Sequence, residues 1–248
     1  MPDSGHGGAF PATRFSVLAA ARSPEASERA VALDALFTAY WKPVYKFVRL
    51  RWSRSPEDAQ DLTQGFFAEL FERQLLTQFD PAKSHLRTYL RVCLQSFVLN
   101  QDKAASRQKR GGNIEHFALD AAAAEAEMAR TLDPAKLPSP ETLETFFEKE
   151  WIRNLFTLAV EDLRGLAESK NKRTAFALFE RYDLDGDASA SYAELASQYA
   201  IAVTDVTNNL AWARREFKRL ALDRLQSLCG SEAEFEHEAR ALFGWSPR

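Results

Sequence analysis

The chain has 248 residues, of which 46% are hydrophobic, and its formal net charge is -3. This content suffices for one large core or two small ones, and the charge balance excludes a uniformly basic nucleic-acid binder. Two cysteines, Cys93 and Cys229, are too few for a disulfide framework and predict a reducing compartment. No apolar run reaches the ~20 residues of a membrane span, and residues 1–8 lack signal-peptide features. We therefore expect a cytoplasmic protein with no membrane partner.

The apolar residues follow a helical pattern from residue 15 onward, after a small, polar, Gly-rich start over residues 1–14 that we expect to be disordered. Between Leu33 and Val48, apolar residues recur at three- and four-residue steps. Pro43 lies inside this pattern and is expected to kink or split the helix. No stretch alternates cleanly with period two, so the sequence predicts an all-α fold.

Two further helices complete a first helical domain, which we place at residues 15–112. Ser55 and Pro56 mark the start of one helix, with a cap, a proline at the first helical position and acids in the first turn. The next helix is expected from Ser84 to the glycine pair at residues 111–112. Residues 113–140 are Ala-rich, acidic and Pro-containing, which predicts a linker. A second helical domain is expected over residues 141–228 and a tail over residues 229–248.

The second domain contains a pattern typical of a helix-turn-helix. Ser191 and Glu194 form a capping box, Ala200 occupies the turn, and the second helix is expected from about Thr204. Ala200 costs about 1 kcal/mol if the turn needs a positive φ. An ordinary helical hairpin with a capped first helix is the alternative. The candidate DNA-binding residues of the second helix are Thr204, Thr207, Asn208, Asn209, Arg214, Arg215 and Lys218.

The helix expected from Ser84 is strongly basic. Between residues 83 and 110, seven bases face one acid, Asp102, and this local excess of six positive charges can hold a phosphate backbone. The alternative is a solvated face. Tyr89 and Phe97 have the chemistry to stack on single-stranded bases, but we favour core positions for both. The candidate DNA-binding residues of this helix are Arg87, Arg91, Asn100, Lys103, Arg107, Lys109 and Arg110.

Two parts of the chain resemble, in the same order, conserved regions of a known family. Residues 40–49 (YWKPVYKFVR), 56–67 (PEDAQDLTQGFF) and 85–90 (HLRTYL) resemble the second region of extracytoplasmic-function sigma factors. Residues 192–219 resemble the fourth region, a helix-turn-helix, and the resemblance covers about half of the chain. It implies two small helical domains and a non-enzymatic subunit that carries core RNA polymerase to a promoter and assists DNA melting in transcription initiation.

The resemblance also implies roles for individual residues. Asp58, Asp61 and Gln64 lie where the family binds the clamp helices of the largest polymerase subunit, although the two acids also suit helix capping. The basic helix corresponds to the element that captures the non-template single strand of the promoter. The extended linker and tail are similar to a subgroup linked to Ser/Thr kinases, which makes Thr63 a candidate phosphorylation site. An anti-sigma protein is another candidate partner.

Other kinds of site are not expected. Residues 183–187 with Glu194 are similar to parts of a calcium-binding EF-hand loop, but Ala188 stands where that loop needs glycine. The histidines lack ligand spacing, and no phosphate loop or catalytic dyad is present, so we predict no metal, no cofactor and no enzymatic activity. Two alternatives to a sigma factor remain. They are a free-standing helix-turn-helix regulator of transcription and a helical signalling scaffold.

Overall fold

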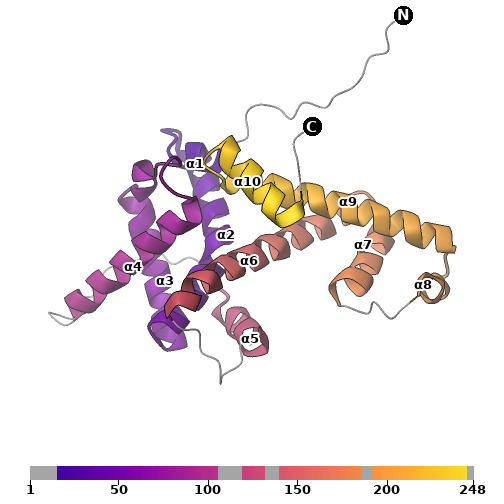
Figure 1. Ribbon diagram of the computed structural model, residues 1–248, viewed down its shortest axis with the longest axis horizontal. Helices are drawn as coiled ribbons and strands as arrows, with labels where there is room; N and C mark the ends of the chain where they lie inside the picture. Colours follow the sequence, from indigo (N-terminus) through magenta and orange to yellow (C-terminus); the bar gives the residue numbers. More distant parts are fainter. Residues whose placement is uncertain (1–15, 106–118, 132–139, 186–190, 245–248) are drawn as a thin grey trace, which may run out of the picture.

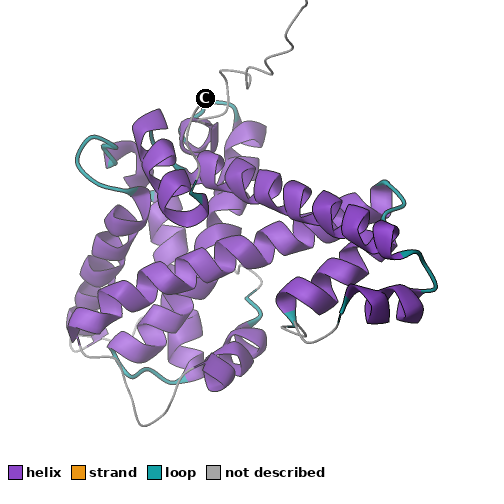
Figure 2. Cartoon of the chain, turned by 45° about the vertical axis from the view of Figure 1, so that its right-hand side comes forward, coloured by secondary structure: helices purple, strands orange, loops and turns teal. Residues whose placement is uncertain are grey.

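The computed structural model describes residues 16–105, 119–131, 140–185 and 191–244, and over these ranges it confirms the all-α fold (Figures 1 and 2). The first part contains α1 (Ser16–Ala21), α2 (Ala26–Arg51), α3 (Pro56–Glu72), the 3-10 helix η1 (Leu75–Gln78) and α4 (Leu86–Ala105). Then follow α5 (Ala121–Thr131), α6 (Pro140–Ser169), α7 (Arg173–Phe179), the π-helical η2 (Glu180–Leu184), α8 (Tyr192–Tyr199), α9 (Val203–Leu228) and α10 (Glu232–Phe243).

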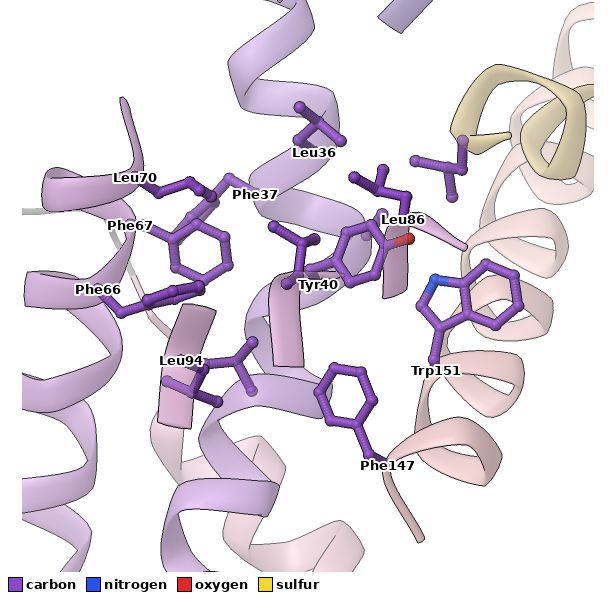
Figure 3. Packing of buried hydrophobic residues seen from close by; sticks show 14 of the residues in the cluster. Leu36, Phe37, Tyr40, Phe66, Phe67, Leu70, Leu86, Leu94, Phe147 and Trp151 are labelled. Carbon is purple, nitrogen blue, oxygen red and sulfur yellow. The ribbon is translucent and has the colours of Figure 1, made fainter. Parts of the chain in front are cut away.

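Helix α2 is the centre of the first hydrophobic cluster. It continues through Pro43 as one helix, so the split that the sequence suggested does not occur. A proline inside a helix costs about 3 kcal/mol, and the packing of α2 on two sides offsets that cost. Figure 3 shows Phe66 and Phe67 of α3 on one side of α2, and Phe147 and Trp151 of α6 on the other.

Aromatic pairs hold these three helices together. Phe37 meets Phe67 edge to face, with ring centroids 5.0 Å apart. Tyr40 stacks on Trp151 at 6.3 Å, and its side chain is 1% exposed. Each such pair contributes about 0.5–1.5 kcal/mol beyond the burial of its area. The sequence pattern of α2 therefore produces a helix with two apolar faces, one for α3 and one for α6.

A second hydrophobic cluster lies between α7, α8 and parts of α6 and α9. The two clusters share both long helices, which Figure 1 shows side by side across the molecule. Helix α6 supplies Leu155 to the first cluster and Leu163 to the second. Helix α9 supplies Leu210 to the second cluster and Leu225 to the first. Two continuous helices therefore join the clusters.

The segments expected to be linker and tail are partly helical and packed. Helix α5 lies within residues 113–140, and its Ala124 is fully buried in the first cluster. Helix α10 lies within residues 229–248, and Phe235 and Ala239 belong to the same cluster. Alanine-rich sequence suits a helix as well as a linker, and contacts with the rest of the chain decide between them. The first cluster therefore contains residues from both ends of the chain.

Candidate nucleic-acid interface

Helix α4 carries the candidate residues for single-stranded DNA, and its own apolar face positions them. Leu86, Leu90 and Leu94 are buried in the first cluster, which fixes the rotation of the helix. Arg87 and Arg91 follow directly after two of these leucines and are mostly covered, with side chains 14% and 13% exposed. The basic side chains at the start of α4 are therefore largely shielded from solvent by other parts of the chain.

Arg87 is held by two carboxylates and an aromatic ring. Its Nη2 donates a hydrogen bond to Oε1 of Glu238 in α10 at 2.8 Å, and its Nε lies 3.9 Å from Oε1 of Glu148 in α6. The guanidinium lies over the ring of Trp151, 5.0 Å from the centroid. Burial is the largest single influence and disfavours the charge of Arg87, but the hydrogen bond and charge of Glu238, together with the charge of Glu148, outweigh it, so the pKa of the guanidinium is raised.

His85, directly before α4, and Arg91 within it have acidic partners as well. Nδ1 of His85 lies 3.0 Å from Oε1 of Glu234 and 3.7 Å from Oε1 of Glu238. Arg91 forms an ion pair with Glu144 of α6. Acids from α6 and α10 therefore neutralise the basic start of α4, where the sequence placed two phosphate contacts.

The far end of α4 is open to solvent. Asn100 and Lys103 are exposed, and Asp102 forms an ion pair with Arg54 at 2.5 Å. Three other candidates, Arg107, Lys109 and Arg110, lie outside the described residues. Among the described candidates of α4, Asn100 and Lys103 are thus the two that are exposed.

Of the two aromatic residues of α4, Phe97 has the core position that we favoured, and Tyr89 packs partly buried against the first cluster. Phe97 is 6% exposed and packs against Phe66, with centroids 5.9 Å apart. Tyr89 is half-buried beside Phe79, and its hydroxyl donates to the backbone carbonyl of Leu75 at 2.6 Å. Both rings are engaged in internal packing in this structure.

Helix α3 presents the candidate polymerase contacts in two environments. Ser55 caps the helix by accepting a hydrogen bond from the backbone N–H of Asp58 at 3.1 Å, which confirms the predicted start. Asp58 and Asp61 are exposed, so both carboxylates face solvent. Gln64 is 6% exposed and Thr63 is fully buried. The two acids are available to a partner, whereas the other two candidates lie within the fold.

Helices α8 and α9 meet at the turn that the sequence predicted. The capping box of Ser191 and Glu194 is confirmed, with both reciprocal hydrogen bonds formed. Ala200 adopts the left-handed conformation, with φ 52° and ψ 45°, and the N–H of Ile201 donates to the carbonyl of Ala196 at 3.0 Å. This arrangement closes the end of α8 and starts α9 at Val203.

The first turns of α9 are accessible but uncharged apart from one acid. Thr204, Thr207 and Asn208 are exposed, and Asn209 is half-buried. The bases come later in the helix. Arg214 forms two hydrogen bonds with Asp183 of 2.9 Å each, and these hydrogen bonds raise its pKa despite partial burial.

The remaining bases of α9 have contacts of their own. Arg215 lies 3.4 Å from Glu216, and Nζ of Lys218 lies 3.5 Å from the backbone carbonyl of Phe243. Both are exposed. Asp183 belongs to the EF-hand-like sequence, whose residues 186–190 lie outside the described ranges. Because its carboxylate is paired with Arg214, it already has a cationic partner.

Sequence reasoning missed the acids that cover α4. Glu144 and Glu148 are four residues apart on α6, as are Glu234 and Glu238 on α10, so each pair shares one helical face. That spacing was visible in the sequence. The partner of each face was not, because Arg87 and Glu238 are 151 positions apart in the chain.

Comparison with family models, with curated proteins and with solved structures finds no match. Within the described ranges, no helix combines the length and apolar character that crossing a membrane requires. The same residues contain no group of three or more potential metal ligands. The function of the chain must therefore be inferred from its sequence pattern and from the geometry of the described helices.

Proposed function

We propose that the protein is a sigma factor, a subunit that binds core RNA polymerase, directs it to promoters and assists DNA melting. The observation that carries the proposal is that the first cluster holds both α3, with its exposed acids Asp58 and Asp61, and α4, with the exposed amide of Asn100 and the exposed ammonium of Lys103. Asp58 and Asp61 are free to meet basic groups of a protein partner. Asn100 and Lys103 have the chemistry to bind bases and phosphates of a single strand.

The second part of the proposal assigns upstream promoter recognition to α8 and α9 as a helix-turn-helix. The exposed start of α9 supports it, because this is the part of a recognition helix that reaches base edges. Asn208 has the side chain that reads adenine, and Arg215 and Lys218 lie further along for phosphates. With few charges at its start, α9 contributes less affinity than a basic recognition helix does. Helices α3 and α4 of the first cluster therefore contribute most of the proposed binding to polymerase and promoter.

Run-off transcription with core polymerase tests the assignment. The template is a promoter candidate taken from DNA that the protein retains together with polymerase. We expect a run-off product only when the chain is added to core enzyme. Duplex binding without polymerase, combined with no run-off product, would instead indicate a free-standing helix-turn-helix regulator. Neither activity would leave a helical scaffold.

The proposed regulation by a Ser/Thr kinase needs a change of conformation. The hydroxyl of Thr63 is buried and donates to the backbone carbonyl of Ala59 at 2.7 Å, so a kinase reaches it only when α3 separates from the first cluster. A phosphate there would bring about -1.5 to -2 charges into an apolar core. A Thr63→Ala variant that activates its target promoter as fully as wild type in cells excludes this regulation.

A further inference from the structure

We propose that α10 and the turn before it form an autoinhibitory latch, which closes over the basic start of α4 and keeps nucleic acid away from it. This inference rests on the proposed function, because it assigns a regulator to the DNA-binding face of the same unit. The latch consists of residues 229–243, and its closed state is the one seen in the structure. Opening it removes Glu234 from His85 and Glu238 from Arg87, while the contacts of Arg87 with Glu148 and Trp151 of α6 remain.

Two buried acids of the latch take the places that phosphate oxygens would occupy. Glu234 and Glu238 have side chains only 8% and 6% exposed, and they face His85 and Arg87. The hydrogen bond from Arg87 to Glu238 uses Nη2, a donor that a phosphate contact would also need. Glu238 and a phosphate of nucleic acid therefore compete for this donor.

The turn of the latch packs closely against the loop before α4. A Cβ added to Gly230 would lie 2.7 Å from Cβ of Pro81 and 2.9 Å from Cε1 of Phe79, both in the loop before α4. The N–H of Gly230 donates to Oε2 of Glu234 at 2.7 Å, which orients that carboxylate. Glycine is therefore needed here for close contact between two segments.

Another anion can replace the acids of the latch as the partner of Arg87. Its contacts with His85 and Arg87 are ionic, and a buried ion pair adds little net stability because the desolvation of both charges opposes their attraction. Phe235 and Ala239 of α10 pack in the first cluster, and the loss of their burial opposes opening. A nucleic acid that replaces Glu238 restores the hydrogen bond of Arg87 and adds further phosphates along α4. A nucleic acid that binds Arg87 only in the open state therefore shifts the equilibrium toward opening.

Two variants open the latch in different ways. Gly230→Ala places a methyl group against Pro81, and Glu238→Gln removes the charge that holds Arg87. We expect each full-length variant to bind a fluorescein-labelled single-stranded oligonucleotide of randomised sequence about tenfold more tightly at low salt, measured by fluorescence anisotropy. Hydrogen exchange of the α10 amides should accelerate about tenfold, which corresponds to about 1.4 kcal/mol.

Matched controls separate the latch from general effects. Gly165→Ala adds a methyl group to α6 at a site with no neighbour within 4 Å. Glu232→Gln removes the same charge as Glu238→Gln from an exposed position on the same helix. We expect both controls to keep affinity and exchange within about twofold of wild type. If Glu232→Gln raises affinity as much as Glu238→Gln does, general electrostatics explains the gain and the latch is refuted.

The outcome is independent of the sigma-factor test. Faster exchange of α10 without tighter oligonucleotide binding overturns the latch, even if wild type supports run-off transcription. Tighter binding by both variants without any run-off product supports the latch and overturns the sigma assignment. Unchanged exchange and affinity in both variants also refutes the latch.

Discussion

Lys46 and Glu150 form a buried ion pair, with Nζ 2.7 Å from Oε2 and side chains only 2% and 4% exposed. The same ammonium lies 2.7 Å from Oε2 of Glu127, so one lysine of α2 binds acids of α5 and α6. Replacing Lys46 by methionine leaves Glu150 buried without this partner. We expect Lys46→Met to lower the free energy of unfolding by about 3 kcal/mol in urea denaturation.

The matched control is Lys170→Met, at an exposed position. It should change the free energy of unfolding by less than about 0.5 kcal/mol. The double variant Lys46→Met with Glu150→Leu should regain much of the lost stability, because an apolar pair needs no desolvation of charge. A single variant as stable as wild type contradicts the prediction.

Glu125 should make stability depend on pH in acid. Arg49 donates to it at 2.5 and 3.1 Å, and these hydrogen bonds are the main cause of its lowered pKa; burial opposes the shift, and the hydroxyl of Tyr45 at 2.7 Å adds to it. Because the folded-state pKa lies below the unfolded value, the stabilisation is present above the unfolded pKa of about 4.3 and is lost as pH falls through the folded one.

The Glu125→Gln variant tests this dependence. The difference in unfolding free energy between wild type and variant should be constant at neutral pH and shrink as pH falls below about 4. Glu168→Gln, at an exposed position of α6, is the control. A difference that persists unchanged into strong acid would show that the carboxylate charge of Glu125 contributes nothing.

The turn between α8 and α9 offers a gain of stability. Ala200 has φ 52°, a conformation that glycine adopts without steric cost. Ala200→Gly should raise the free energy of unfolding by about 0.5–1 kcal/mol. Ala202, at φ -71° and ψ 153°, is the matched control, and Ala202→Gly should destabilise slightly through chain entropy. Thermal denaturation of both variants tests this prediction. If both variants shift the melting temperature equally and in the same direction, Ala200 is not strained.

The acids of α3 should affect polymerase binding more than folding. In the double variant Asp58→Asn with Asp61→Asn, the helix loses one favourable first-turn charge, that of Asp58, and we expect about 1 kcal/mol or less of destabilisation. Affinity for core RNA polymerase should fall at least tenfold, about 1.4 kcal/mol, in anisotropy titrations. Glu57→Gln on the same helix is the control. Unchanged affinity of the double variant would remove the role assigned to these carboxylates.

Thr63 should tolerate an apolar substitute better than a charged one. Thr63→Val removes one buried hydroxyl bond, and we expect a loss of about 1 kcal/mol. Thr63→Glu places a carboxylate in the first cluster and should cost about 3 kcal/mol or more. Urea denaturation compares the two variants. Equal stability would mean that the side chain reaches solvent, contrary to its burial in the structure.

The sequence predicted local structure better than contacts between distant segments. The caps at Ser55 and Ser191 depend on residues within a few positions, so the local sequence is enough to predict them. The continuity of α2 through Pro43 was not predictable, since packing with α3 and α6 compensates for the local preference.

The candidate site likewise has features that the local sequence predicts and contacts between distant segments that it does not. The basic character of α4 and the exposure of Asp58 follow from composition and helix position. The closure of Arg87 by Glu238 does not, because it depends on how α9 directs α10 back to the first cluster. A count of charges over residues 83–110 treated every base as free, whereas the fold supplies acids from two other helices.

Helix α9 connects two distant parts of the molecule without interruption. Its 26 residues span about 39 Å at ~1.5 Å per residue, from the turn at Ala200 to the turn at Gly230. Because the described helix has no break between these ends, α9 fixes the separation between the turn at Ala200 and the turn that precedes α10. One helix thus belongs at one end to the proposed helix-turn-helix and at the other to the seat of the proposed latch.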